Sequence, residues 1–255
     1  MSEMRWTAVV RPAERAVSGR VVVLPHSGSG PNALLPVLRR LPDTIEVVGV
    51  TLPGRERRFI ESCAGLADDP GRVIDAVLDE LGATTPRPTV LFGHSMGAVF
   101  AVALALEAPD LCQGLVLSAY SGDPAAAERA GEWTEAEMLD VVRRGDGTPD
   151  DVLADPAVRE HVLGLLRCDL TLEHRLAARN AGRRLPVAPT VLGGWDDLLV
   201  SPCELTQWAS RAPAGTRERL FPGGHFYLLE EANLDAVAAE IAVAIGPLRK
   251  SAAGA

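Results

Sequence analysis

The sequence has little positive charge and no long hydrophobic run. Lysine and arginine together number 25 against 34 aspartates and glutamates, which gives a formal net charge of −9. Nucleic acid and anionic lipid surfaces repel such a chain, so we expect neither as a partner. The longest apolar stretch, 98–106, is too short to span a bilayer, and no basic start followed by an apolar run opens the chain. We therefore expect a cytoplasmic protein with no membrane partner.

Cysteine is also scarce and carries no ligand pattern. The four cysteines, Cys63, Cys112, Cys168 and Cys203, form no C-x-x-C pair and have no histidine at zinc-ligand spacing. We interpret them as reduced thiols. Hydrophobic residues make up 47% and charged residues 23%, a globular composition, and 255 residues suit one domain spanning 1–255.

Short β-branched runs bounded by glycine or proline alternate with stretches of helical spacing. The expected strands are 21–24, 46–50, 89–92, 115–117, 190–192 and 219–221, and the expected helices include 33–41, 70–81, 96–107 and 234–245. All the strands but the last are nearly continuous apolar segments, as strands buried on both faces should be. The alternation predicts an α/β fold with a mainly parallel sheet, helices on both faces and ligand sites at the carboxyl ends of strands.

The segment 134–184 breaks this alternation. It contains helical stretches at 134–144 and 155–167 but no convincing strand, with Gly145, Gly147 and Pro149 between them. Thr134 and Glu137 have the spacing of a capping box, and Asp155 before a proline suits a helix N-cap. About fifty residues exceed what one crossover needs. We expect a helical lid subdomain here, with two ordinary crossover helices as the alternative.

The strongest chemical signal is the pentapeptide from Gly93 to Gly97, which fits G-x-S-x-G around Ser95. It follows a predicted strand and precedes an apolar helix, the context of a nucleophile elbow. The serine there sits on a tight, strained turn, so Gly93 and Gly97 must leave room for strand and helix to pack closely. We predict that Ser95 is a catalytic nucleophile.

A serine nucleophile needs a base and an orienting carboxylate, which in this fold follow it in the order Ser, acid, His. His225 lies in a glycine-rich loop after the last predicted strand and is the candidate base. The strand before it leads into Asp196 and Asp197. Neighbouring side chains on an extended strand point to opposite sides, so only one can meet the imidazole. We favour Asp197 and keep Asp196 as the alternative acid.

Acyl transfer also needs donors for the oxyanion. One candidate is the backbone N–H of Met96, directly after the nucleophile, and the other is that of Ser27, in a flexible glycine-containing loop after the first predicted strand. A phosphate-cradling loop is the rival reading of 25–30, but neither G-K-[ST] nor G-x-G-x-x-G follows.

Four motifs together resemble the type II thioesterases of polyketide synthases and nonribosomal peptide synthetases, an α/β-hydrolase family. They are Leu24-Pro25-His26-Ser27-Gly28, Leu52-Pro53-Gly54-Arg55-Glu56, Gly93-His94-Ser95-Met96-Gly97-Ala98 and Gly223-Gly224-His225-Phe226-Tyr227-Leu228. The resemblance runs from about residue 20 to 245 and supports the same five site residues together with a helical lid. It departs at Ser27 and Ser29, where the family often has smaller residues.

The resemblance implies an editing thioesterase that removes acyl groups from the phosphopantetheine arm of acyl or peptidyl carrier proteins during antibiotic biosynthesis. It implies no metal or organic cofactor, and we expect a monomer. The alternatives are a carboxylesterase acting on oxygen esters and a non-catalytic ligand-binding protein of the same fold.

The negative net charge bears on this partner, because carrier proteins are typically acidic. Local charge then matters more than the total. Arginines cluster at 55, 57 and 58, at 143 and 144, and at 183 and 184. A cluster beside the site entrance would provide docking charge, whereas solvated faces and helix C-terminal charges are the alternative reading.

Overall fold

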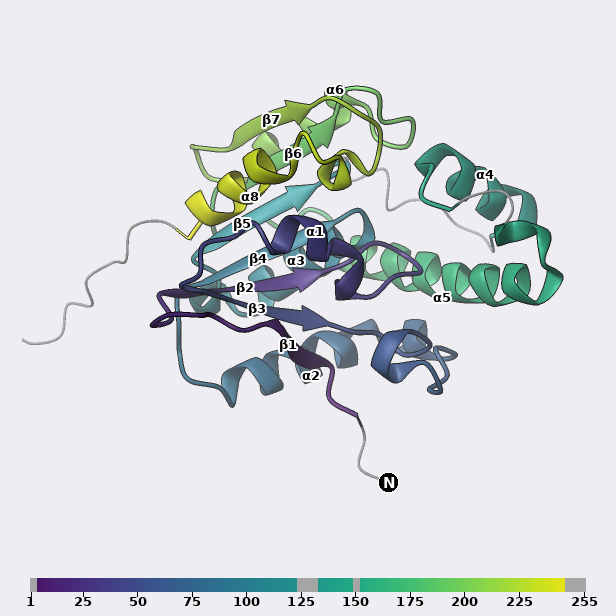
Figure 1. Ribbon diagram of the computed structural model, residues 1–255, viewed down its shortest axis with the longest axis horizontal. Helices are drawn as coiled ribbons and strands as arrows, with labels where there is room; N and C mark the ends of the chain where they lie inside the picture. Colours follow the sequence, from purple (N-terminus) through teal and green to yellow (C-terminus); the bar gives the residue numbers. More distant parts are fainter. Residues whose placement is uncertain (1–3, 123–132, 149–151, 246–255) are drawn as a thin grey trace, which may run out of the picture.

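The computed structural model describes residues 4–122, 133–148 and 152–245 and is built around a seven-stranded sheet. The strand order is β1-β3-β2-β4-β5-β6-β7, and all neighbours pair in parallel except β1 with β3 (Figure 1). The strands are β1 (Thr7–Arg11), β2 (Gly19–Leu24), β3 (Ile45–Val50), β4 (Thr89–His94), β5 (Gly114–Ser118), β6 (Thr190–Gly194) and β7 (Arg217–Phe221). The predicted α/β fold with a mainly parallel sheet is confirmed.

The central strands are buried because helices cover both faces of the sheet. Every residue of β2, β4, β5 and β6 is buried, which agrees with their apolar runs. The first three residues of the edge strand β7 are exposed. All six predicted strands exist, each one or two residues longer than expected.

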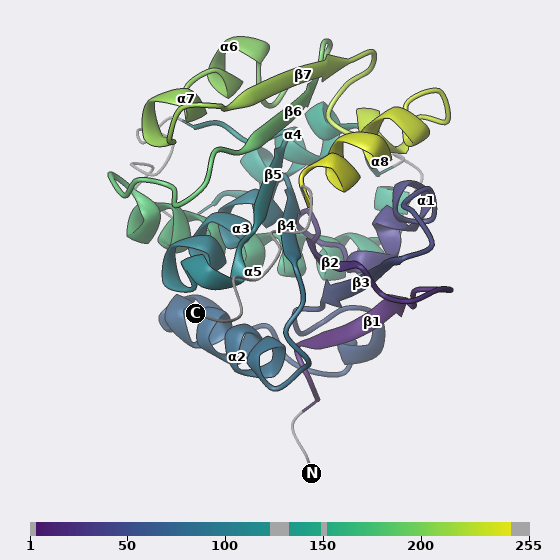
Figure 2. The ribbon, with the colours of Figure 1, turned by 90° about the vertical axis from the view of Figure 1, so that its left-hand side faces the viewer.

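Two helical layers sandwich the sheet, as the turned view in Figure 2 shows. One face carries α1 (Leu35–Leu38) and α8 (Leu234–Val243), and the other carries α2 (Pro70–Gly82), α3 (Met96–Glu107) and α5 (Pro156–Asn180). The apolar helix α3 is buried along nearly its whole length and packs against β4 and α5. Each layer has its own hydrophobic core, so the sheet is held from both sides and its carboxyl edge is firmly placed.

The segment 134–184 contains α4 (Glu135–Gly145), η6 (Val152–Ala154) and α5. The predicted capping box of Thr134 and Glu137 is confirmed, and Asp155 caps α5 through the N–H groups of Ala157 and Val158. The expected end of the second helix at 167 is wrong, because α5 runs on to Asn180 and buries its later turns against α3. Pro149 lies outside the described residues.

Other differences arise where tertiary contacts decide the local structure. The expected helix 33–41 is wrong, because this stretch divides into η1 (Pro31–Leu34) and the single turn α1. β1 was not expected, and it is anchored by the carboxylate of Glu80, which accepts from the N–H groups of Trp6 and Thr7. The remaining elements are η2 (Glu56–Arg58), η3 (Leu66–Asp68), η4 (Pro109–Leu111), α6 (Pro202–Leu205), α7 (Trp208–Arg211) and η7 (Tyr227–Leu229).

Within the described residues, no helix is both long enough and apolar enough to cross a bilayer.

Candidate active site

Ser95 lies on a sharp turn between β4 and α3. Its backbone has φ 54° and ψ −126°, a conformation that side chains rarely adopt and that stores strain at functional sites. A Cβ at Gly93 would lie 2.1 Å from the carbonyl oxygen of Gly97, and one at Gly97 would lie 1.9 Å from that of Leu24. The two glycines therefore permit the close approach that the turn requires, as the G-x-S-x-G pattern predicts.

His225 and Asp197 meet at the same edge of the sheet. The His225 Nδ1 and Asp197 Oδ2 atoms are 2.8 Å apart, and both side chains are buried, with 4% and 1% exposed. The other carboxylate oxygen of Asp197 accepts from the N–H groups of Leu199 and Val200, which fixes its orientation. The bond at Nδ1 leaves Nε2 of His225 as the ring nitrogen available for proton transfer.

Asp196 takes a different direction from its neighbour. Asp196 is exposed, and its backbone N–H donates to the carbonyl of Gly223 at 3.0 Å. The loop thus separates the two adjacent aspartates, and it is the carboxylate of Asp197 that faces His225.

Two further histidines pack beside His225. The ring centroid of His94 lies 5.2 Å from that of His225, and the centroid of His26 lies 5.7 Å from that of His94. Burial lowers the pKa of His26 to about 4 and that of His94 well below its usual range, with the charge of His225 adding to both shifts. Both stay uncharged at neutral pH, so His225 can accept a proton without a neighbouring cation opposing it.

His94 also belongs to a buried hydrogen-bond chain behind the nucleophile. Its Nδ1 is 2.9 Å from the hydroxyl of Ser118, which in turn is 2.7 Å from the hydroxyl of Tyr227. The carbonyl of Ser118 accepts from the N–H of Ser95 at 2.8 Å. The chain links β4, β5 and η7, so it stiffens the turn that carries Ser95.

The loop after β2 is held from the opposite side of the cavity. The carboxylate of Asp169, on α5, accepts from the N–H of Gly28 at 2.6 Å and from the guanidinium of Arg55 at 2.6 and 2.8 Å. Arg55 is 4% exposed and Asp169 is fully buried. Because Gly28 follows Ser27 directly, this bridge sets the position of the Ser27 backbone.

The two predicted oxyanion donors remain without acceptors. Among the described residues, neither the N–H of Ser27 nor that of Met96 donates to another protein group. Met96 is the first residue of α3, where N–H groups have no partner within the helix. The two groups are therefore free to bind an oxygen of a ligand.

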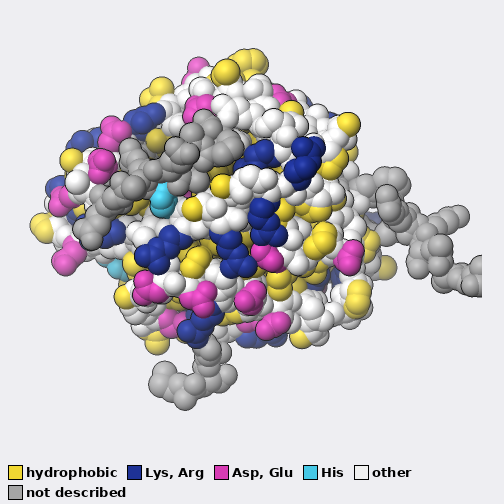
Figure 3. Space-filling model, turned by 180° about the vertical axis from the view of Figure 1, so that it is seen from behind, with side chains coloured by type: hydrophobic (Ala, Val, Ile, Leu, Met, Phe, Trp, Pro, Cys, Tyr) yellow, Lys and Arg dark blue, Asp and Glu magenta, His cyan; other side chains and the backbone are white. Residues whose placement is uncertain are grey.

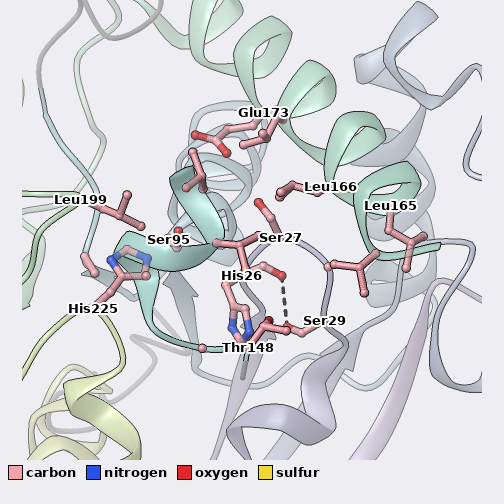
Figure 4. A pocket seen from close by; sticks show the side chains of 18 of the residues that line it. His26, Ser27, Ser29, Ser95, Thr148, Leu165, Leu166, Glu173, Leu199 and His225 are labelled. Carbon is pink, nitrogen blue, oxygen red and sulfur yellow. Dashed lines mark hydrogen bonds between the residues drawn. The ribbon is translucent and has the colours of Figure 1, made fainter. Parts of the chain in front are cut away.

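A cavity of about 860 Å³ brings these elements together (Figure 4). Its sheet side carries Ser95, His225 and the loop after β2, where the hydroxyl of Ser29 donates to the carbonyl of His26. Its helical side is formed by α4 and α5, including Leu166 and Glu173. The volume suits an extended acyl chain rather than a bulky macromolecule.

The arginines near this cavity are mostly paired inside the molecule. Arg58 is 1% exposed, bonds Glu61 at 2.5 Å and lies over the ring of Trp6, so it provides no surface charge. Arg183 pairs with Glu107 at 2.7 Å. On the face in Figure 3, basic side chains cross the middle with acidic ones directly beneath them. Two of the three arginine clusters reach the cavity: Arg55 lines it but is buried in its pair with Asp169, and the arginines at 143 and 144 lie between the lining residues Val142 and Gly145.

Sequence reasoning missed the parts of the site that lie across the cavity from Ser95. Asp169 and Glu173 are four residues apart on α5, a spacing that places both on one helix face, but the expected helix ended before them. Within residues 4–122, 133–148 and 152–245, no cluster of His, Cys, Asp and Glu is arranged to hold a metal ion.

Comparisons with known proteins agree on one family. The profile of the thioesterase domain family matches residues 19–244. A probable cadicidin biosynthesis thioesterase from Streptomyces griseus is 35% identical, over 98% of this chain and 68% of that protein. The structure of the type II thioesterase BorB from the borrelidin biosynthetic cluster has a TM-score of 0.72 and 29% identity, over 92% of this chain and 97% of that one. RedJ, from the prodiginine pathway of Streptomyces coelicolor, has a TM-score of 0.71 and 25% identity, over 92% and 96%.

Proposed function

The chain belongs to the thioesterase domain family, and from that premise we propose that it hydrolyses acyl thioesters on the phosphopantetheine arm of carrier proteins in polyketide or nonribosomal peptide biosynthesis. Its hydrolase fold and its similarity to type II thioesterases such as BorB support this activity. The observation that carries the proposal is the buried His225–Asp197 pair, 2.8 Å apart, in the cavity that the strained Ser95 turn enters.

Each residue has a role that follows from its position. Ser95 is the nucleophile, His225 the general base through Nε2, and Asp197 the carboxylate that orients the ring and stabilises its protonated form. The N–H groups of Ser27 and Met96 stabilise the oxyanion, each worth about 3 kcal/mol in such sites. His26 and His94 pack around the base as neutral rings.

The reaction has two steps. His225 takes the proton of the Ser95 hydroxyl while the oxygen attacks the thioester carbonyl. Collapse of the oxyanion then breaks the carbon–sulfur bond, the pantetheine sulfur leaves with the proton, and the acyl group stays on Ser95. Water gives a proton to His225 as it attacks the ester, and the carboxylic acid is released with Ser95 restored.

Arg55 and Asp169 act as positioning residues in this scheme. Their buried ion pair reaches the N–H of Gly28 and so fixes the loop that presents the Ser27 donor. Because Asp169 is on α5, the same contact connects the helical side of the cavity to the catalytic side.

The carrier protein docks, in our proposal, beside the exposed end of α4. Arg143 and Arg144 lie there and are exposed; the guanidinium of Arg144 is 3.6 Å from the carboxylate of Asp140 and also donates to the carbonyl of Leu198. Replacing both by glutamine should raise KM for a carrier-bound thioester and leave the same thioester on N-acetylcysteamine unaffected. Equal effects on both substrates would remove this pair from the docking surface.

Turnover of an acyl carrier protein thioester by a Ser95→Ala variant tests the proposed function. We expect a loss of at least about a thousandfold in kcat with the fold intact, because the covalent route disappears. Full turnover by the variant would overturn the assignment.

Two other functions make different predictions. A carboxylesterase would prefer p-nitrophenyl esters to thioesters of the same acyl chain, and a non-catalytic binding protein would leave both intact. The lid role of 134–184, its membership with the rest of 1–255 in one domain, the monomeric state and the cytoplasmic location remain predictions from the sequence.

A further inference from the structure

One carboxylate in the cavity has no role in the mechanism above. Glu173 lies on α5 and lines the cavity, and Figure 4 shows its carboxylate across the cavity from His225 and Ser29. The nearest lining residues before it on the same helix are apolar and run from Val162 to Leu170; His161, near the start of the helix, is polar. Glu173 is therefore an acid that follows an apolar stretch of the lining, a stretch that suits a hydrocarbon chain.

The surroundings of Glu173 leave its charge uncompensated. Among the described residues, no basic side chain forms an ion pair with it, and the hydroxyl of Tyr120 is its hydrogen-bond partner. Burial raises the pKa of Glu173 to about 7, the bond from Tyr120 opposes the shift, and the charge of Asp169 adds to it. The site therefore holds a carboxylate that a cation would stabilise.

The neighbouring acids are already satisfied. Asp169, one turn earlier, is bound by Arg55 and by the N–H of Gly28. Glu204 also lines the cavity, but its carboxylate accepts from the N–H and the hydroxyl of Ser201 in a capping box. Glu56 lines the cavity too, and its carboxylate accepts from the N–H and the side-chain amide of Asn32. Of these cavity acids, Glu173 is the one whose carboxylate has a hydroxyl, that of Tyr120, as its partner and neither a backbone N–H nor a guanidinium.

We propose that Glu173 forms a polar subsite that binds an amino group carried on the distal part of the acyl chain. This rests on the proposed function and narrows its substrate class. A protonated amine would donate a charge-assisted hydrogen bond to the carboxylate and replace the lost solvation of both groups. A plain alkyl chain in the same position would leave the buried carboxylate with the hydroxyl of Tyr120 as its partner and no compensating cation.

A matched set of thioesters tests this subsite. The probes are N-acetylcysteamine thioesters of six, eight and ten carbons whose acyl chains end in an amine or a hydroxyl. Each probe is compared with a thioester whose chain has a methyl group in the place of the amine or hydroxyl. We expect the amine to exceed its methyl counterpart in kcat/KM by about tenfold at one length or more, the range of a hydrogen bond to a charged group. The hydroxyl chain should fall between them.

The variant Glu173→Gln keeps the shape of the side chain and removes its charge. The ratio of amine to methyl kcat/KM should fall about tenfold in this variant. The control is Glu204→Gln, which removes a carboxylate from the same cavity and should leave the ratio within about twofold of wild type. Between pH 6 and 8 the wild-type preference for the amine should rise as Glu173 ionises, with Tyr120 and Asp169 as the groups that face it.

The outcomes separate this proposal from the proposed function. If the wild type hydrolyses the thioesters with methyl-terminated chains and Ser95→Ala does not, the proposed function is supported, independently of the amine subsite. A wild-type ratio near one at every length, a hydroxyl chain hydrolysed better than the amine, or an equal fall in both glutamine variants would each overturn the amine subsite. Circular dichroism of the variants excludes loss of the fold as the cause.

Discussion

The two walls of the cavity are built in different ways. The sheet wall carries Ser95, His225 and Asp197 on short turns at strand ends, where neighbouring backbones approach so closely that a single Cβ would collide. The helical wall consists of α4 and α5, which form a small core of their own around Met138 and Leu166. The first wall is fixed by backbone contacts and the second by side chains.

The two walls are suited to different tasks, the sheet wall to catalysis and the helical wall to recognition of the acyl chain. Chemistry that repeats with every substrate needs a preorganised geometry, which the strand ends supply. Recognition of an acyl chain depends on which side chains a helix presents, and these can change without disturbing the sheet. We therefore expect variants in the sheet wall to affect kcat and stability strongly, and variants in the helical wall to affect selectivity.

The largest effect should come from the acid of the sheet wall. Asp197→Asn would disturb the tautomer and orientation of His225 and should lower kcat by about ten-thousandfold, as in comparable triads. Asp196→Asn, one residue away, should change kcat by less than about threefold, because this exposed carboxylate does not face the base. Steady-state hydrolysis of one thioester by both variants checks the pair, and comparable losses would contradict the geometry.

Next in size is a pair of glycine substitutions, one in each wall. Gly97→Ala places a Cβ 1.9 Å from the carbonyl oxygen of Leu24 and should destabilise the protein by about 4 kcal/mol or more. Gly164→Ala, in the middle of α5, meets no atom within 4 Å and should stabilise it by about 0.5–1 kcal/mol. Urea unfolding measures both, and a destabilised Gly164→Ala would show that α5 is less tolerant than we infer.

The bridge between the walls should have an intermediate effect. Asp169→Ala leaves the buried guanidinium of Arg55 without its partner and should cost about 3 kcal/mol of unfolding free energy. It should also lower kcat more than it raises KM, because the loop with Ser27 loses its anchor. The exposed pair of Arg175 and Asp68, 3.6 Å apart, is the control, and Asp68→Asn should change stability by less than about 0.5 kcal/mol. An unchanged kcat in Asp169→Ala would separate the bridge from the oxyanion loop.

The smallest predicted effect is an opposite pH response of the two walls. Because the pKa of His26 is lowered in the folded protein, the native state binds fewer protons than the unfolded state. The contribution of His26 to stability is therefore present above pH 6.5 and is lost as pH falls toward 4. The raised pKa of Glu173 gives stability below pH 4.5 that is lost as pH rises through 7.

Melting curves of two variants test this response. Glu173→Gln should gain on wild type by about 3 °C in Tm between pH 5 and 8, and His26→Gln by a similar amount between pH 6.5 and 4.5. These Tm differences are smaller than the full pKa shifts would give, because both side chains border a cavity. Differences that stay constant with pH would remove these two groups as the cause.

The sequence predicted the sheet wall of the cavity better than the helical wall. Six of the seven strands, α3 and the elbow at Ser95 follow from local patterns, because buried parallel strands are apolar runs and a tight turn demands glycine. The exception is the antiparallel edge strand β1. The choice of Asp197 over Asp196 depended on the strand-like alternation of side chains, and only the folded loop shows which carboxylate faces His225.

The helical wall was less predictable for a physical reason. α5 continues past 167 because its later turns pack on α3, a contact that no local pattern reveals. The partners of Asp169 lie 114 and 141 residues away, at Arg55 and Gly28, so its role could not be derived from spacing. The short elements α6 and α7 were missed for a related reason, since a single turn has too few residues to show a period.

Labelling with an acyl phosphonate tests whether Ser95 is the catalytic nucleophile, because a slow, irreversible phosphorus ester marks the nucleophile itself. We expect one adduct per chain, located on Ser95 by peptide mass spectrometry, with thioester hydrolysis lost in proportion to labelling and no adduct in Ser95→Ala. Complete labelling that leaves hydrolysis intact, or an adduct on another residue with the same loss of activity, would contradict it.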